Sequence, residues 1–422
     1  MPLVDNLRIG EPVLRWSARA HSIAEIEVEL ARIWSGQDLS TSVDGKAGRH
    51  VAARTSVMNL IVVARRPEIA ERTAATMQAL TGRHPSRTIV IQSADPDGPS
   101  WLDARVEAHC VVPREDAPET CAETIHITCG GEAGRHLSAI STPLVVHDLP
   151  VAVWWPGEPL LTRQPARELL EGADRLIVDG STWSGDGLTR LREMAELMDT
   201  TTLAVSDFAL ERQARWREAI ASIFDERDFL PYERYLRRVA VTYSTHDETG
   251  TPGSTNLVKP IYHVGWLASR LGLSVVKTLA PVADRHWPGG PQARATGRGR
   301  GPAPRPVMSR GHTATLSDGR AEVAVVIRPI ASPTPPGTTL RVELLAERRG
   351  SELRADVTAE AEFVNVRVWQ DGVEAMERHF RAPRRTEVEL LAEAIESTGR
   401  DFVATGALWS ASTIIGPHWG AA

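Results

Sequence analysis

The chain is poor in the features that build crosslinked or membrane-embedded proteins. Its 422 residues contain only three cysteines, too few for a disulfide scaffold. No apolar run approaches the roughly 20 residues that a helix needs to cross a bilayer. The N-terminus also lacks a basic segment followed by an apolar one, so we expect no signal peptide and a cytoplasmic protein.

Lysine is almost absent. Only Lys46, Lys259 and Lys277 occur among 48 basic residues, and the rest are arginines, a bias that indicates a GC-rich genome rather than arginine-specific recognition. A net charge of -6 argues against general nucleic-acid binding. The composition, 42% hydrophobic and 24% charged, is typical of a globular protein with a sizeable core, and the length suits two domains.

The sequence also lacks the short motifs of common catalytic and cofactor sites. The glycine-rich segment 130–134 has neither G-x-G-x-x-G spacing nor a P-loop lysine, so we interpret it as a strand-to-helix turn. There is no G-x-S-x-G elbow. His126, Cys129 and His136 fall short of the four matched ligands of a structural zinc site. We therefore expect no catalytic, cofactor-binding or metal-binding residues.

Residues 1–160 have the pattern of an α/β domain. A buried strand, a helix opened by Pro67 and a second strand form a βαβ unit, whose strands should be parallel. A hairpin is expected to follow it. The expected elements are helices at 22–35, 67–80 and 132–141 and strands at 55–64, 88–91, 101–112 and 121–129.

Residues 161–422 are expected to form a second domain that changes from α/β to α+β. Three prolines and a glycine within 156–165 suggest the boundary. Consecutive strands with short turns towards the C-terminus favour a mainly antiparallel sheet. The expected strands are 176–180, 202–205, 239–243, 273–279, 321–328, 338–347, 352–358, 361–369 and 376–381, with helices at 187–199, after Ser206, at 255–271 and at 385–398.

A loop over 285–312 is dominated by proline, glycine and arginine and contains no acidic residue. Such a composition buries too little apolar surface to order itself, so we interpret it as a flexible insertion. The alternative is a basic arm that contacts an acidic partner or a phosphate.

The most distinctive segment runs from Pro143 to Pro159 and contains two adjacent tryptophans. Proline and glycine bound a short strand on both sides. Side chains alternate along a strand, which places Trp155 on one face and Trp154 on the other. We expect Trp155 to be core, and Trp154 to face a second layer, a second domain or a partner.

This run, with segments spread over most of the chain, resembles the glucose-6-phosphate dehydrogenase assembly protein family (OpcA). His147 is a departure from the family pattern. The resemblance implies a non-catalytic protein without a cofactor, which binds glucose-6-phosphate dehydrogenase of the oxidative pentose phosphate pathway, helps to assemble it and activates it allosterically. The matching segments are 53–62, 84–87, 176–179, 206–212 with 216–217, 265–272, 389–391 and 399–401.

The candidate partner-binding residues are Trp154, Asp148 and Trp183. Redox control is known in cyanobacterial members of the resembled family, which makes the three cysteines redox candidates. Alternation puts Cys110 and Cys129 at buried positions, where cysteine behaves as a small hydrophobe. If the two strands of the hairpin pair, Cys110 could meet Cys121 or Cys129.

Two other functions compete with this reading. One is an α/β enzyme acting on a phosphorylated metabolite, because the loop 179–183 follows a strand where parallel sheets bind ligands. The other is nucleic-acid binding through the arginine-rich loop, which the overall acidity disfavours.

Overall fold

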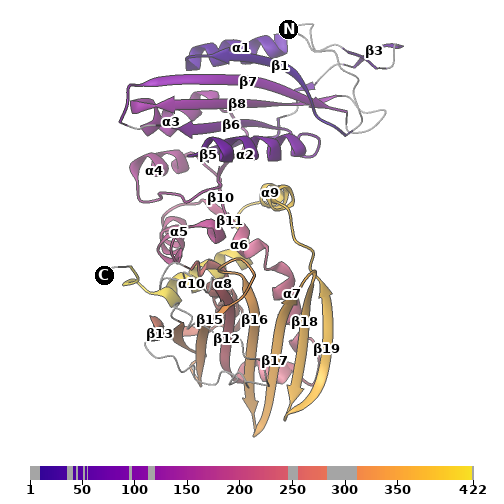
Figure 1. The fold of residues 1–422 in the computed structure, drawn as a ribbon, viewed down its shortest axis with the longest axis vertical. Coiled ribbons are helices and arrows are strands. Elements are labelled where there is room, and N and C mark those ends of the chain that lie inside the picture. Colours follow the sequence, from indigo (N-terminus) through magenta and orange to yellow (C-terminus); the bar gives the residue numbers. More distant parts are fainter. Residues whose placement is uncertain are drawn as a thin grey trace, which may run out of the picture. The chain divides into compact units, whose positions relative to one another are not determined.

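The computed structural model describes residues 10–35, 41–43, 46–50, 53–54, 56–94, 97–112, 119–245, 255–282 and 311–420. Most of the predicted loop 285–312 lies outside them. The chain forms two compact units (Figure 1). The first unit contains Met1–Asp179, Leu197–Ser206 and Arg385–Asp401, and the second contains Gly180–Glu196, Asp207–Arg384 and Phe402–Ala422. The structure thus divides the chain differently from a single boundary at residue 160.

The first unit is built on a mixed sheet in the order β1-β7-β8-β6-β5-β9-β10-β11, with β4 also pairing with β8. Strands β8, β6, β5, β9 and β10 are parallel to one another, whereas β7 is antiparallel to both β1 and β8. The strands are β1 Val13–Ala20, β4 Ala53–Arg54, β5 Met58–Ala64, β6 Ser86–Ser93, β7 Trp101–Val111, β8 Thr120–Gly130, β9 Val151–Trp155, β10 Arg175–Val178 and β11 Ala204–Asp207, and a separate hairpin joins β2 Thr41–Val43 to β3 Lys46–His50.

Within this sheet, the order β8-β6-β5-β9-β10-β11 is that of a dinucleotide-binding Rossmann sheet, 3-2-1-4-5-6. The predicted βαβ unit is confirmed as β5, α2 and β6, with β5 and β6 parallel. The predicted helix over 132–141 is instead a 3-10 turn and a short α-helix that meet at His136. The helices of this unit are α1 Ile23–Ser35, η2 Gly131–Arg135, α2 Pro67–Leu80, α3 Leu137–Ser141, η3 Thr142–Leu144, α4 Gln164–Glu171 and α9 Glu387–Glu396.

Helix α9 joins the first unit although it lies near the end of the chain. Thr386 begins it with a capping box, in which its hydroxyl accepts from the Glu389 amide. The Thr76 hydroxyl on α2 donates to Glu387 at 3.2 Å. Beyond the helix, the guanidinium of Arg175 on β10 donates to the carbonyls of Ser397 and Gly399, at 2.6 and 2.7 Å.

The second unit contains an eight-stranded sheet in the order β13-β14-β15-β12-β16-β17-β18-β19. It is antiparallel except for the pair β12–β15, which is parallel, so the expected antiparallel sheet fits in part. The strands are β12 Leu236–Thr245, β13 Ser274–Pro281, β14 His312–Ser317, β15 Glu322–Ala331, β16 Thr339–Arg348, β17 Ser351–Glu360, β18 Phe363–Gln370 and β19 Val373–Arg381.

Helices α7 and α8 pack on the apolar face of this sheet, which includes Val239, Val241, Val342 and Val366. Helix α10 lies beside α8, where Gly265 leaves no room for a Cβ because the carbonyl of Ala407 would be 2.5 Å away. No helix among the described residues is long and apolar enough to cross a membrane. The remaining helices are η4 Gly180–Thr182, α5 Leu188–Thr200, α6 Phe208–Glu211, α7 Ala214–Phe224, η5 Leu230–Tyr235, α8 Val258–Leu271 and α10 Phe402–Ile415.

Candidate interaction and redox sites

The Trp-Trp strand, β9, lies between β5 and β10 in the first sheet. Trp154 stands opposite Val62 on one side and Ile177 on the other. Both indoles are buried, with 0% of Trp154 and 4% of Trp155 exposed. Strands inside a parallel sheet are covered on both faces, so alternation separates two buried faces here rather than a buried and an exposed one. The indole of Trp154 therefore offers no contact surface in this structure, and its assignment as a partner-binding residue stays a prediction.

The turn before this strand is held by a buried side chain. The amide group of Asn59 donates to the carbonyls of Val146 and Leu149, at 2.9 and 3.3 Å, and its oxygen accepts from the Val146 amide at 2.7 Å. The turn brings Asp148 to the surface with a left-handed φ of 66°. Aspartate tolerates this conformation better than most residues. Of the three candidate partner-binding residues, Asp148 is the one with an exposed side chain.

Trp183 lies in the second unit, in the loop that would be the best candidate pocket if the protein were an enzyme, although the sequence favours an ordinary strand-to-helix loop. The loop is filled by protein groups. Asp207 accepts hydrogen bonds from the Gly180 amide and the Tyr262 hydroxyl, each at 2.9 Å, and Asn256 donates to the carbonyls of Gly180 and Trp183. A Cβ on Gly180 would lie 2.7 Å from the Asp207 carboxylate. Trp183 itself is buried, so this loop packs the protein rather than forming a cradle.

The ends of β5 and β9 form the point where the strand order of the first sheet reverses. Open α/β sheets bind ligands at this point, and a dinucleotide needs a glycine-rich turn after the first strand. Here Arg65 and Arg66 occupy the turn and Pro67 begins α2. Proline supplies no N–H donor, and the Cβ atoms of Arg65 and Arg66, which glycine lacks, keep the backbone from approaching a pyrophosphate closely. The residues present do not fit a dinucleotide held in the Rossmann manner.

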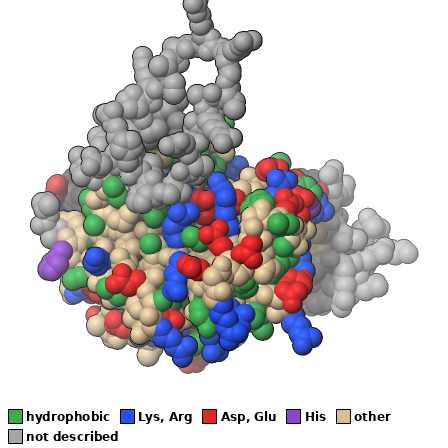
Figure 2. Space-filling model, turned by 90° about the horizontal axis from the view of Figure 1, so that it is seen from below, with side chains coloured by type: hydrophobic (Ala, Val, Ile, Leu, Met, Phe, Trp, Pro, Cys, Tyr) green, Lys and Arg blue, Asp and Glu red, His purple; other side chains and the backbone are tan. Residues whose placement is uncertain are grey.

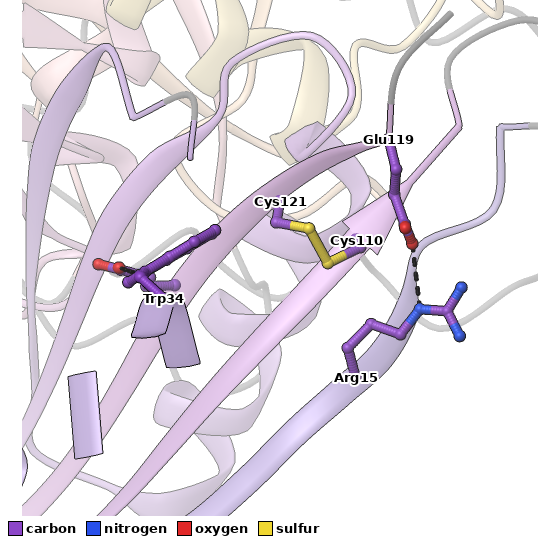
Figure 3. The surroundings of a disulfide bond; sticks show 6 residues. Arg15, Trp34, Cys110, Glu119 and Cys121 are labelled. Carbon is purple, nitrogen blue, oxygen red and sulfur yellow. Dashed lines mark hydrogen bonds and ion pairs between the residues drawn. A yellow bond between two sulfur atoms is a disulfide. The ribbon is translucent and has the colours of Figure 1, made fainter. Parts of the chain in front are cut away.

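Two of the three cysteines form a disulfide, Cys110–Cys121 (Figure 3). The two residues face each other across the antiparallel pair β7–β8, with Cα atoms 4.0 Å apart. Sequence reasoning placed Cys110 at a buried position on a hairpin strand, which is confirmed, and left its partner open between Cys121 and Cys129. Disulfides are uncommon in reducing compartments, and those present there are usually catalytic or redox-sensing.

Cys129 is the free cysteine among the described residues, and it is buried near the end of β8. Burial raises the pKa of its thiol to about 11. A thiol with so high a pKa supplies almost no thiolate at neutral pH, so Cys129 is a poor nucleophile. The redox roles of Cys110, Cys121 and Cys129 stay predictions.

Buried ion pairs surround the disulfide, and sequence reasoning missed them. The Arg15 guanidinium on β1 donates to the Glu119 carboxylate at 3.0 Å, with both side chains almost fully buried (Figure 3). Glu123 on β8 accepts from Arg87 and from the Trp34 indole. The sequence signal for these pairs was a charged residue within a strand whose other residues are apolar and buried. A buried charge needs a partner. Breaking one such pair leaves an uncompensated buried charge.

One possible metal-ligand group occurs in the described part of the chain, formed by Cys110, Glu119 and Cys121. Both cysteine sulfurs are joined to each other here, and a metal requires free thiolates. His126, Cys129 and His136 form no such group within the described residues. His136 instead contacts Glu132 at 2.9 Å.

Figure 2 shows one face of the molecule in space-filling form. Hydrophobic side chains are scattered among charged ones there rather than gathered in one broad patch. Single exposed hydrophobic residues are normal on protein surfaces and do not identify an interface.

Two solved structures are similar to this chain at low identity. The transcriptional regulator Gal80p from Kluyveromyces lactis matches with a TM-score of 0.41 and 8% identity, over 81% of this chain and 79% of that one. An NAD-binding oxidoreductase from Klebsiella pneumoniae matches with a TM-score of 0.44 and 10% identity, over 85% and 96% of the two chains.

Comparison with known sequences is more specific. The OpcA family model described as "Glucose-6-phosphate dehydrogenase subunit N-terminal domain" matches residues 77–196, and its C-terminal counterpart matches residues 203–408. A curated protein of Synechocystis sp., named "Putative OxPP cycle protein OpcA", is 25% identical over 211 residues. That alignment covers 50% of this chain but only 41% of the curated protein. Because the two family models together span most of the sequence, the chain belongs to the OpcA family of glucose-6-phosphate dehydrogenase assembly proteins.

Proposed function

We propose that this protein binds glucose-6-phosphate dehydrogenase directly, helps to assemble it and activates it allosterically, without catalysing a reaction itself. The family match over both halves of the chain carries the proposal. The turn Arg65-Arg66-Pro67 supports the non-catalytic part, because it occupies the position where a Rossmann dehydrogenase holds its dinucleotide. The filled loop around Gly180 gives no support to the alternative of a phosphorylated-metabolite enzyme.

The physical basis of activation is linkage. A protein that binds the active form of the dehydrogenase more tightly than the inactive form shifts the population towards the active form. A coupling free energy of about 1–3 kcal/mol changes the affinity for substrate by roughly 5–150-fold. A stable complex should bury at least about 1,200 Å² of surface in total.

The test is to mix the purified protein with its cognate dehydrogenase. We expect a higher initial rate at glucose 6-phosphate concentrations below KM, and co-elution of the two proteins in size-exclusion chromatography. Unchanged kinetics together with separate elution would contradict the proposal. Thermal-shift measurements with sugar phosphates and nucleotides test the alternative, since an enzyme for a phosphorylated metabolite should be stabilised by one of them.

The exposed turn at Asp148 provides the first mutational probe of the interface. Asp148→Asn removes the charge and keeps a residue that tolerates the left-handed φ of 66°. We expect weaker dehydrogenase binding with the fold retained. Asp199→Asn is the matched control, because Asp199 is also an exposed aspartate of the first unit. Equal binding by both variants would remove Asp148 from the interface.

A further inference from the structure

The Cys110–Cys121 disulfide has a third potential metal ligand beside it. Cross-strand register places Cys110 on β7 directly opposite Cys121 on β8. Glu119 comes just before β8 and two residues before Cys121, a spacing that puts two side chains on the same face of a strand. A carboxylate oxygen of Glu119 and the two sulfurs lie within 4.8 Å of one another (Figure 3).

All three side chains are buried. The exposed fraction is 0% for each cysteine and 1% for Glu119. Arg15, itself only 8% exposed, donates to the Glu119 carboxylate at 3.0 Å. Carboxylates that bind a metal are themselves held by hydrogen bonds from outer groups, which fix their orientation. The contact with Arg15 therefore holds Glu119 in place as a ligand and does not exclude metal binding.

The charges of this group match a divalent cation. When the disulfide is reduced and both thiols lose their protons, the two cysteines and Glu119 carry three negative charges. Arg15 offsets one of them through its ion pair with Glu119, which leaves two. The neighbouring Glu123 and Arg87 pair with each other and add no net charge. Buried charges are either paired or coordinate metals, and a divalent cation neutralises the remaining two.

The donor atoms of the group favour zinc among divalent cations. Magnesium and calcium take oxygen ligands, whereas two thiolates are soft ligands that zinc accepts. Zinc also binds carboxylate oxygens, and sites with three protein ligands keep a fourth tetrahedral position for water. Two sulfurs and one carboxylate oxygen therefore make a three-ligand zinc site.

We propose that Cys110, Cys121 and Glu119 bind a zinc ion when the disulfide is reduced. A dithiol reductant supplies two electrons and two protons, so that the S–S bond breaks, each sulfur becomes a thiol, and the reductant becomes a disulfide. Zinc then displaces both thiol protons to solvent as two Zn–S bonds form. The disulfide and the zinc site are thus mutually exclusive states of the same two cysteines. This inference does not depend on dehydrogenase binding.

The experiment is a titration of the full chain with Co²⁺, reduced by a phosphine and followed by absorption spectroscopy, with Zn²⁺ as the competitor. We expect a saturable thiolate-to-cobalt band that Zn²⁺ removes, and no such band in the oxidised chain. Cys110→Ser should abolish the band, whereas Cys129→Ala should keep it, because Cys129 lies near the other end of β8. X-ray absorption of the zinc-loaded unmodified chain should show two sulfurs at about 2.3 Å and oxygen at about 2.0–2.2 Å.

Glu119→Gln tests the carboxylate ligand and should weaken zinc binding at least about tenfold, since loss of an outer partner alone costs 10–100-fold. The matched control is Glu107→Gln, because Glu107 is also buried and paired with an arginine, but lies three residues before Cys110 and so on the other face of β7. X-ray absorption of the unmodified chain keeps the proposal falsifiable if a variant does not fold. A reduced chain without the cobalt band, a zinc shell without sulfur, full binding by Cys110→Ser, or equal affinities of Glu119→Gln and Glu107→Gln would overturn it.

Discussion

The Cys110–Cys121 disulfide should make the first unit sensitive to reductant. The bridge joins residues 11 apart in sequence. Loop-closure entropy for a loop of that length predicts a stabilisation of roughly 3 kcal/mol. A unit of roughly 200 residues changes its Tm by about 2–4 °C per kcal/mol. Reduction should therefore lower the unfolding temperature of the first unit by about 6–12 °C.

Because the chain has two units, unfolding need not be two-state, and the assay should resolve the units. Hydrogen exchange followed by mass spectrometry is suitable, since peptides from β7 and β8 report on the bridged strands. We expect faster exchange in these peptides after reduction, with peptides of β16 and β17 unchanged. Combined Cys110→Ala and Cys121→Ala should reproduce the reduced state and abolish the response to reductant. Cys129→Ala should respond as the unmodified chain does, and an unmodified chain with the same Tm and exchange in both redox states would refute the reasoning.

Three further predictions follow from buried side chains. Trp154→Ala should destabilise the first unit by about 3–5 kcal/mol in denaturant unfolding, whereas Trp101→Ala, at a half-exposed indole, should cost clearly less; equal costs would contradict the core role of Trp154. Burial lowers the pKa of His263 to about 3 and of His312 to about 4. As the pH falls, the unfolded state therefore takes up protons on these histidines before the folded state does. The second unit should lose stability as the pH falls below about 6.5, the ordinary pKa, and His263→Leu should reduce that loss; an unchanged acid profile would exclude His263. Cys129 should react with iodoacetamide at neutral pH far more slowly than a free cysteine does, because its thiol pKa is about 11. Peptide mapping of the reduced native chain measures this rate. Modification at the rate of the unfolded chain would show that the thiol is not buried.

Local sequence patterns predicted where the first sheet has strands and helices better than they predicted which faces of those elements are buried. The strand at Met58–Ala64, the helix opened by Pro67 and the hairpin of β7 and β8 follow from periodicity and turn residues. Alternation along β9 also separated Trp154 from Trp155 correctly. It could not show that both faces are buried, because that depends on strands distant in sequence that pair on either side.

Features of the candidate site could be predicted only where they depend on residues that are close in the sequence. Burial of Cys110 followed from alternation, but its pairing with Cys121 required the register of the hairpin. The buried ion pairs Arg15–Glu119 and Arg87–Glu123 could not be predicted, because their members are far apart in the sequence and meet only in the folded unit. The long-range return of α9 to the first unit left no local signal either. Helix α10 was missed, because the last predicted helix was the one at 385–398.

The return of α9 has a consequence for synthesis on the ribosome. Domains generally complete folding once all their residues have left the exit tunnel. The first unit includes Arg385–Asp401. Helix α2 therefore gains its hydrogen bond to Glu387, and β10 gains its hydrogen bonds to the carbonyls of Ser397 and Gly399, only after this segment has been synthesised. The first unit therefore lacks its last helix until nearly the whole polypeptide has been made, although all strands of its sheet precede residue 208. A prematurely terminated chain lacking this segment would carry an incomplete first unit, even though most of that unit's sequence had been translated.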